Sequence, residues 1–177
     1  EYYLTRKETE ILQKSAAEII SKLPYKTHLV ELGSGSSTKT RILLEAAMER
    51  FGETQYSPID VSAEILTNTV NDLVKRYPEL QLEAVAGRYE FGMEYILKHS
   101  TTSNCIMWLG SSIGNLTRVE AAQFLREVRK NIGDDDSLLL GIDLRKGPEI
   151  LEPAYDDASG VTADFNLNLL DRINTEL

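Results

Sequence analysis

The residues best suited to chemistry form a glycine-rich turn that follows an apolar run. The turn has the pattern Glu31-x-Gly33-x-Gly35, and Asp60 ends the next short apolar run. Glycine has no Cβ atom, so a ligand can approach the backbone of such a turn closely. A carboxylate such as that of Asp60 can accept hydrogen bonds from both hydroxyls of a ribose. Together these residues indicate a binding site for a ligand that contains a nucleoside.

Two phosphate-binding patterns are close to this turn, and both fail at Thr38. A P-loop requires its second glycine, and a dinucleotide fingerprint its third glycine, at the position of Thr38. The Cβ atom of Thr38 would crowd the phosphate cradle in the first case and the contact between helix and strand in the second. Glu31 would also repel a phosphate, whereas it suits a cationic or neutral ligand. We therefore disfavour a nucleotide that is held by its phosphates.

An adenosine with an amino-acid tail and a sulfonium centre fits the same residues better. S-adenosylmethionine has this chemistry: Asp60 would bind its ribose, and Lys39, in the first turn of the next helix, could reach its carboxylate. Two simpler interpretations stay open at this point. Lys39 can be a solvated helix residue, and Asp60 can be the N-terminal cap of the helix that follows it.

Segments of helical period and of strand period alternate along the chain, which predicts a parallel sheet with helices on both faces. Helices are expected at residues 5–23, 38–51, 62–78, 89–98 and 117–130, with more helix at the end of the chain, and strands at residues 27–32, 55–60, 80–87, 104–110 and 137–143. Capping boxes at Thr5-x-x-Glu8 and Thr117-x-x-Glu120 predict the starts of the first and fifth helices.

The ends of these strands should carry the site, because ligands of such folds bind at the carboxyl ends of the strands, where the strand order reverses. The residues expected there are polar and glycine-rich: 33–37, Asp60, 87–89, 110–115 and Asp143. Asn115 offers an amide oxygen that can accept a hydrogen bond from a substrate amine, although it can also be an ordinary helix cap. The loop after the fourth strand lacks the Asn/Asp-Pro-Pro-aromatic motif of many base methylases, which argues against a nucleobase substrate.

The composition argues against several classes of partner. A formal net charge of -9 over 177 residues does not suit a protein that binds nucleic acid. No apolar run approaches the roughly 20 residues of a membrane span, and no metal site is expected, because Asp134–Asp136 lack the spacing of a calcium loop. Cys105, the single cysteine, is expected in the core and predicts a cytoplasmic protein. We expect one domain over residues 1–177, and because both ends look cut we expect it to be a fragment.

Five stretches of the sequence resemble the histidine-specific methyltransferase family. They read EYYLTRKETEIL, VELGSGSSTKTRILLEA, PIDVS, WLGSSIGN and AYDDASGVTADFNLNLLDRIN. The resemblance implies a Rossmann-like class I methyltransferase fold, S-adenosylmethionine as cofactor, and methylation of the α-amine of histidine to trimethylhistidine in ergothioneine biosynthesis. The fungal branch of the family implies dimethylallyltryptophan as an alternative substrate and an ergothioneine-synthase-type domain fused outside this chain. A catalytically silent nucleotide-binding fragment is the remaining alternative.

The same resemblance implies roles for individual residues. The implied cofactor-binding residues are Gly33, Ser34, Gly35, Lys39, Asp60, Gly87, Arg88, Tyr89 and Gly110. The substrate amino acid would be bound by Tyr3, Asn115 and Tyr155, and Tyr3 and Asn115 are the candidate catalytic residues. Bacterial members have Asp-Phe in place of Arg88-Tyr89; Tyr89 can still flank adenine, whereas Arg88 cannot accept a hydrogen bond from the adenine amino group. The family also continues beyond Leu177 into a part that recognises the substrate.

Overall fold

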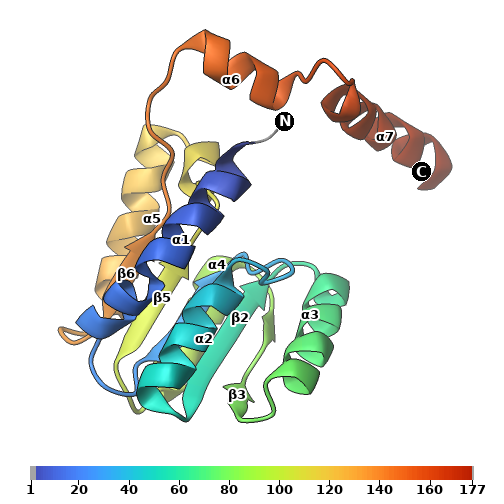
Figure 1. The fold of residues 1–177 in the computed structure, drawn as a ribbon. Coiled ribbons are helices and arrows are strands. Elements are labelled where there is room, and N and C mark those ends of the chain that lie inside the picture. Colours follow the sequence, from blue (N-terminus) through green and yellow to red (C-terminus); the bar gives the residue numbers. More distant parts are fainter. Residues whose placement is uncertain (1–2, 177) are drawn as a thin grey trace.

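In the computed structural model, which describes residues 3–176, six strands form one parallel sheet (Figure 1). The strands are β1 His28–Leu32, β2 Thr54–Asp60, β3 Leu80–Leu82, β4 Val85–Ala86, β5 Asn104–Trp108 and β6 Ser137–Leu140. Their order is β3-β2-β1-β5-β6, and β4 also pairs with β2. Every pair of neighbours is parallel. The predicted parallel sheet is therefore confirmed.

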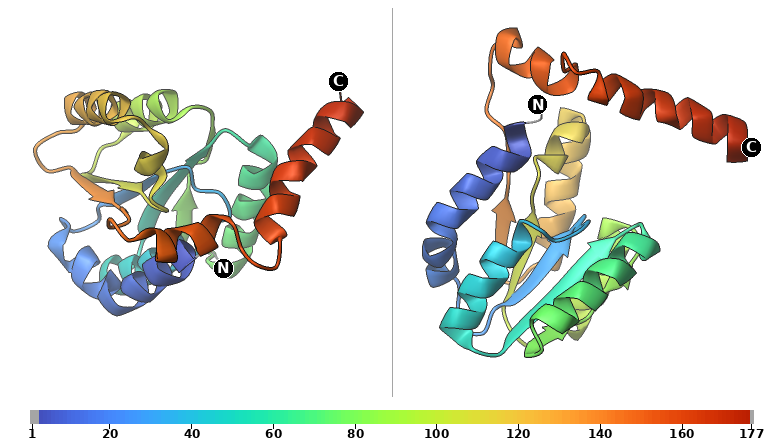
Figure 2. Two further views of the ribbon diagram at one scale, coloured as in Figure 1. Left: turned by 90° about the horizontal axis from the view of Figure 1, so that it is seen from above. Right: turned by 45° about the vertical axis from the view of Figure 1, so that its right-hand side comes forward.

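Helices lie on both faces of this sheet, as the alternation of periods predicts (Figures 1 and 2). They are α1 Tyr3–Lys22, α2 Thr40–Phe51, α3 Ala63–Arg76, α4 Tyr89–His99, α5 Arg118–Asn131, α6 Pro148–Tyr155 and α7 Val161–Glu176, with a 3-10 turn, η1, at Ser112–Asn115. Residues of α1, α2 and α3 share one buried core, whereas residues of α4 and α5 share another. The Rossmann-like α/β fold class is confirmed.

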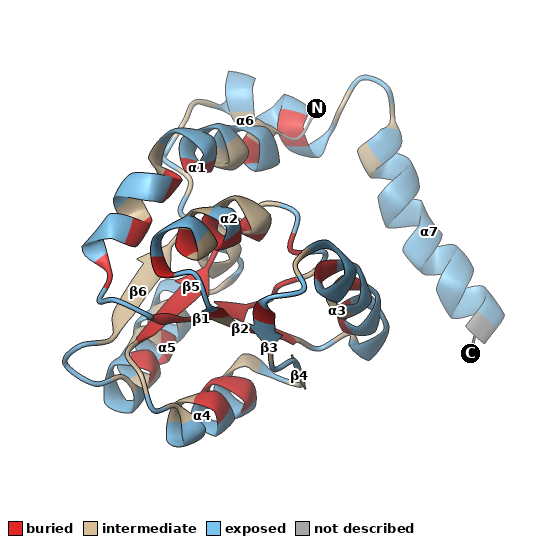
Figure 3. Ribbon diagram, turned by 60° about the horizontal axis from the view of Figure 1, so that its bottom comes forward, coloured by how far each residue is buried: buried red, intermediate tan, exposed pale blue. Residues whose placement is uncertain are grey.

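Neighbouring residues of the central strand supply these two cores. Leu29 packs in the core that contains α1, α2 and α3, and Val30 packs in the core of α4 and α5. Both side chains are fully buried, and burial of an aliphatic side chain contributes about 1.5–3 kcal/mol. Figure 3 shows the buried positions on the inner sides of these helices, while the residues of α7 after Thr162 whose burial is described are exposed.

The strand order reverses beside β1, and this determines where a ligand can bind. From β1 the chain goes to β2 and β3 on one side, and then crosses to β5 and β6 on the other. The loops that follow β1 and β5 therefore run in opposite directions from the point where the strand order reverses. Open α/β sheets bind their ligands at such a point. Residues 33–37 and Gly110 belong to these two loops.

Two details of the sequence prediction are wrong. The capping box at Thr5 does not form, because α1 already begins at Tyr3 and the carboxylate of Glu8 accepts hydrogen bonds from the backbone N–H of Gly110 instead. The strand expected at residues 80–87 is divided into β3 and β4, both paired with β2. The break lies opposite Pro58, which has no N–H to donate. The second capping box, between Thr117 and Glu120, is confirmed.

Gly92 sets how closely α4 packs on β2, and this generates a prediction. A Cβ atom at Gly92 would lie 2.5 Å from Cγ2 of Ile59, which is fully buried and cannot move aside. Gly92→Ala should therefore lower the free energy of unfolding by about 1–3 kcal/mol, the usual cost of overpacking, although alanine is the better helix former. Urea unfolding measures the change.

The double variant Gly92→Ala/Ile59→Ala is the control. Removal of the Ile59 branches makes room for the new methyl group, so the double variant should be less destabilised than the sum of the two single variants. Additive losses would contradict the proposed clash.

Candidate functional site

Asp60 connects the carboxyl end of β2 to the loop that follows β1. Below, the carboxyl ends of the strands and the loops that follow them are called the strand tips. Oδ2 of Asp60 accepts a hydrogen bond from the backbone N–H of Gly35 at 2.9 Å, and its Oδ1 accepts one from the N–H of Ser62, also at 2.9 Å. The cap of α3 is Ser62, whose hydroxyl accepts from Ile65 N, so the simpler interpretation of Asp60 as the cap is wrong. Each Asp60 oxygen retains a lone pair, because a carboxylate can accept about four hydrogen bonds. The carboxylate is thus fixed in place and can still accept two hydroxyls.

The glycine turn beside Asp60 has a shape and a polar atom that suit a ligand. Gly33 and Gly35 have φ angles of +73° and +50°, which non-glycine residues rarely adopt. A Cβ atom at Gly33 would lie 2.6 Å from the hydroxyl oxygen of Tyr89. The hydroxyl of Ser34 is buried and, among residues 3–176, has no hydrogen-bond partner. A buried polar group without a partner is costly, so a ligand that bonds to Ser34 would be stabilised here.

The segment from Gly87 to Tyr89 lies against the same two tips. The N–H of Gly87 donates to the backbone carbonyl of Asp60 at 2.9 Å. Tyr89 packs edge-to-face on Trp108, with ring centres 6.0 Å apart, and burial followed by the charge of Asp60 raises its pKa. Arg88, in contrast, is exposed and precedes α4. The structure therefore brings Gly87 and Tyr89 to the site, while the side chain of Arg88 faces solvent.

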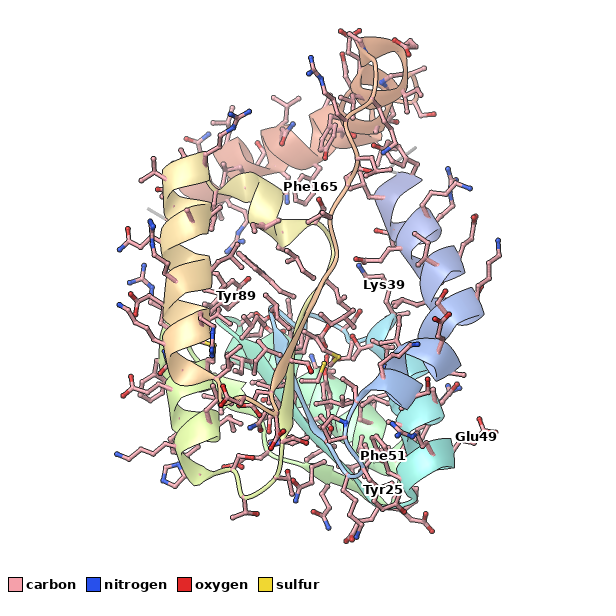
Figure 4. All side chains as sticks on the ribbon, turned by 90° about the vertical axis from the view of Figure 1, so that its left-hand side faces the viewer. Tyr25, Lys39, Glu49, Phe51, Tyr89 and Phe165 are labelled. Carbon is pink, nitrogen blue, oxygen red and sulfur yellow. The ribbon has the colours of Figure 1, made fainter. Side chains whose placement is uncertain are left out.

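Lys39 and Gly110 lie close together at the carboxyl ends of β1 and β5, because a Cβ atom at Gly110 would lie 3.4 Å from Nζ of Lys39. The ammonium group of Lys39 forms an ion pair with the carboxylate of Glu8, which comes from α1. The N–H of Gly110 donates to both oxygens of Glu8, at 2.8 and 3.0 Å. The side chain of Lys39 is only 22% exposed, so the interpretation of Lys39 as a solvated helix residue is wrong. In Figure 4, Lys39 lies on the α1 side of the tips and Tyr89 on the side of α4 and α5.

Tyr3 belongs to a separate cluster of side chains, which it forms with Asp143 and Lys146 from the segment that follows β6. Its hydroxyl donates to Oδ2 of Asp143, and this hydrogen bond raises the pKa of Tyr3. Lys146 bonds to the other oxygen of Asp143, and its ammonium lies 4.9 Å from the centre of the Tyr3 ring. The backbone N–H of Asp143 donates to the hydroxyl of Ser111 at 2.9 Å. Tyr3 is thus tied to the loop that follows β5.

A pocket of about 230 Å³ connects the Glu8 and Tyr3 clusters. Its wall is apolar where α1 faces β6, and polar where Glu8, Ser111 and Asp143 line it. The remaining predicted substrate residues lie on exposed elements: Asn115 ends η1, and Tyr155 ends α6. Thr117 caps α5, so the interpretation of Asn115 as that cap is wrong. The substrate roles of Asn115 and Tyr155 stay predictions.

Sequence reasoning missed Glu8, Asp143 and Lys146 as members of these clusters. The sequence predicts Asp143 only as a residue at a strand end, and it predicts Glu8 only as a member of a capping box. A signal for Glu8 was present, since it falls in the apolar stripe of α1 at four-residue spacing, between Leu4 and Leu12. A carboxylate in such a stripe requires specific partners.

Glu31 lies below the glycine turn and does not face a ligand. The residue is 4% exposed, and its carboxylate accepts hydrogen bonds from the hydroxyls of Thr40, at 2.6 Å, and Tyr56. The expectation that Glu31 serves a cationic or neutral ligand is therefore wrong: it connects β1 to β2 and to the first turn of α2. Burial raises the pKa of Glu31 to about 7, although the two hydroxyls partly offset this effect.

A profile described as "histidine-specific methyltransferase, SAM-dependent" matches residues 1–177. This chain belongs to that family. The histidine N-alpha-methyltransferase of Mycobacterium tuberculosis is 44% identical over 177 residues, which are 100% of this chain and 54% of that protein. Ergothioneine biosynthesis protein 1 of Neurospora crassa is 36% identical over 98% of this chain and 20% of that protein. The 4-dimethylallyltryptophan N-methyltransferase easF of Epichloe festucae var. lolii is 28% identical over 88% of this chain and 48% of that protein.

The chain therefore spans about half the length of the Mycobacterium relative that it matches. A solved structure from Thermobifida fusca, assigned as a methyltransferase, has a TM-score of 0.54 at 17% identity and covers 85% of this chain and 65% of that one. This similarity supports the fold of the methyltransferase family alone. Within residues 3–176, no helix has the length and apolar character to cross a membrane, and no group of three or more metal-ligating side chains is assembled.

The buried Glu31 generates a prediction about pH. Its folded pKa of about 7 lies above the ordinary value of 4.5, so the folded protein binds more protons than the unfolded chain between these values. The free energy of unfolding should therefore fall as pH rises from about 4.5 to 7, by up to about 3 kcal/mol relative to Glu31→Gln.

Urea unfolding of both proteins at pH 5, 6, 7 and 8 measures this difference. Burial also lowers the pKa of His28, but this affects the stability of both proteins equally and cancels in the difference between them. Parallel stability curves for the two proteins would contradict the raised pKa of Glu31.

Proposed function

We propose that this chain is the S-adenosylmethionine-binding part of an N-methyltransferase that acts on the α-amine of histidine. The observation that carries the proposal is the 44% identity to a histidine N-alpha-methyltransferase over the full chain. The Neurospora relative, whose name refers to ergothioneine biosynthesis, supports trimethylhistidine as the product. The buried, reduced Cys105 is in keeping with a cytoplasmic protein.

The residues around the strand tips fit the cofactor of the family. Asp60 would accept the two ribose hydroxyls with its remaining lone pairs, and Ser34 would gain the hydrogen-bond partner that it lacks. Tyr89 would flank the adenine ring, and Lys39 would bind the carboxylate of the tail. The exposed Arg88 plays no part in this proposal.

When bound, S-adenosylmethionine supplies an electrophilic methyl group, which a neutral amine takes by in-line displacement. For this step the protein mainly has to hold the amine in line. The loop from Gly110 to Asn115 would face the amine, and the amide oxygen of Asn115 would accept one of its hydrogens. Tyr3, held by Asp143, and Tyr155 would bind the rest of the amino acid.

Dimethylallyltryptophan is the less favoured substrate of the same chemistry. The relative that acts on it is 28% identical over 88% of the chain, compared with 44% over the whole chain for the histidine enzyme. A fused domain, as the 20% coverage of the Neurospora protein suggests for that relative, stays a prediction for this one.

Substitution of Asp60 tests the cofactor assignment. Asp60→Ala should weaken binding of S-adenosylhomocysteine by about 1–3 kcal/mol, because two charge-assisted hydrogen bonds to the ribose are lost. Calorimetric titration measures the affinity. Asp72→Ala, a change of an exposed aspartate on α3 that pairs with Arg41, is the matched control, and circular dichroism checks the fold. Unchanged affinity in Asp60→Ala would remove the ribose assignment.

The substrate is tested with the longer protein that contains this chain. Incubation with S-adenosylmethionine and either histidine or 4-dimethylallyltryptophan should yield S-adenosylhomocysteine with histidine only. Asn115→Ala should leave cofactor affinity unchanged and raise the KM for histidine, because it removes an acceptor for the amine. If neither amine yields product although the protein binds the cofactor, the result would support the silent nucleotide-binding alternative.

A further inference from the structure

Glu8 is a carboxylate in the middle of an otherwise apolar stripe. The buried residues of α1 are Leu4, Leu12, Ala16 and Ile20, and Glu8 completes their four-residue spacing. Its side chain is 17% exposed. An aliphatic residue at this position would extend the core, whereas a desolvated carboxylate costs free energy unless it is paired. Packing of α1 therefore does not explain why the residue is acidic.

The carboxylate of Glu8 contacts three strand tips at once. It pairs with Lys39, which follows β1, and it accepts from the N–H of Gly110, which follows β5. It also packs on Gly141, which follows β6, so closely that a Cβ atom there would overlap Oε1 of Glu8. Three segments distant in sequence are thus arranged around one acidic group, and this group lines the pocket beside Gly110 and Ser111.

Glu8 still has an unused acceptor site. The two oxygens accept the N–H of Gly110, and Oε2 also accepts from Lys39, whereas a carboxylate offers about four lone pairs. Lys39 likewise has further N–H groups to donate. The pair therefore presents one cationic donor and one anionic acceptor side by side, and Glu8 also lines the pocket.

We propose that Glu8 and Lys39 together form the binding site for the zwitterionic end of the cofactor. Lys39 binds the α-carboxylate, and Glu8 accepts a hydrogen bond from the α-ammonium group. This inference rests on the proposed function and adds to it a binding residue on α1. In the absence of the ligand the two side chains neutralise each other, so neither is left as an unpaired charge.

The alternative is that Glu8 only holds the loops in place. The two interpretations differ in the ligand whose binding they affect. A structural role would influence every ligand of the strand tips, whereas recognition of the ammonium group would influence only ligands that carry it.

Calorimetry on the 177-residue chain with two ligands distinguishes the two roles. S-adenosylhomocysteine has the amino-acid tail, whereas 5′-methylthioadenosine has the same nucleoside without it. Glu8→Gln retains the shape and an acceptor for the N–H of Gly110 but loses the negative charge. It should bind S-adenosylhomocysteine about ten- to hundredfold more weakly, the scale of a hydrogen bond between charged groups, and bind 5′-methylthioadenosine as the wild type does.

Glu10→Gln is the matched control, since Glu10 is on the same helix, is exposed and forms an ion pair with Lys7. It should change neither affinity. Equal weakening of both ligands by Glu8→Gln would overturn the proposal in favour of a structural role. Unchanged affinity for both would overturn it as well.

A measurement on the unaltered protein avoids any dependence on the folding of the variant. A deaminated analogue of S-adenosylhomocysteine should bind the wild type about ten- to hundredfold more weakly than S-adenosylhomocysteine itself. Equal affinities would overturn the role of Glu8 and leave the proposed function intact. If the wild type binds 5′-methylthioadenosine and S-adenosylhomocysteine not at all, the proposed function fails instead.

Discussion

Backbone N–H groups at the tips of parallel strands need acceptors, and in this protein two carboxylates provide them. Asp60 accepts from Gly35 and Ser62, and Glu8 accepts from Gly110. Each acid joins segments that the strand order brings together but does not itself connect. Unpaired N–H groups in such partly buried loops would cost about 1–3 kcal/mol each. Because the same acids retain acceptor sites, the groups that hold the tips together are also suited to bind a ligand.

A third acid, Glu31, has a structural role, because it is buried beneath the glycine turn. It lies one layer below the glycine turn and binds the hydroxyls of Thr40 and Tyr56. Tyr56 also bonds to Ser37 at 2.8 Å, so the network extends into the turn itself. A protonated or well-bonded acid at this depth fixes the relative positions of β1, β2 and α2. The acid before the glycines is thus part of the support for the turn, and the outward-facing acid of the site is Asp60.

Local signals in the sequence are sufficient for most of the fold and for the position of the glycine turn and Asp60 at the strand ends. The glycine turn and Asp60 directly follow apolar runs, so the rule that ligands bind at strand ends located them. The division of β3 from β4 depends on Pro58 in a neighbouring strand, and the partners of Glu8 are up to 102 positions away in sequence. Such contacts arise from packing between elements. The pattern Thr5-x-x-Glu8 predicts a wrong local partner for Glu8. A glutamate at this spacing is typical of a capping box, and its sequence neighbours do not reveal that its carboxylate binds the N–H of Gly110 instead.

The described structure separates the proposed cofactor residues from two of the proposed substrate residues. Asp60, Lys39 and Gly110 are held by hydrogen bonds between strand tips, and their geometry is defined by the sheet. Asn115 and Tyr155 end short helical segments on the surface, and α7 exposes apolar side chains such as Phe165. Tyr3 and Asp143 connect the two regions through Ser111. A change in the position of Asn115 or Tyr155 would therefore leave Asp60, Lys39 and Gly110 in place, because the contacts that hold these three residues do not involve η1 or α6.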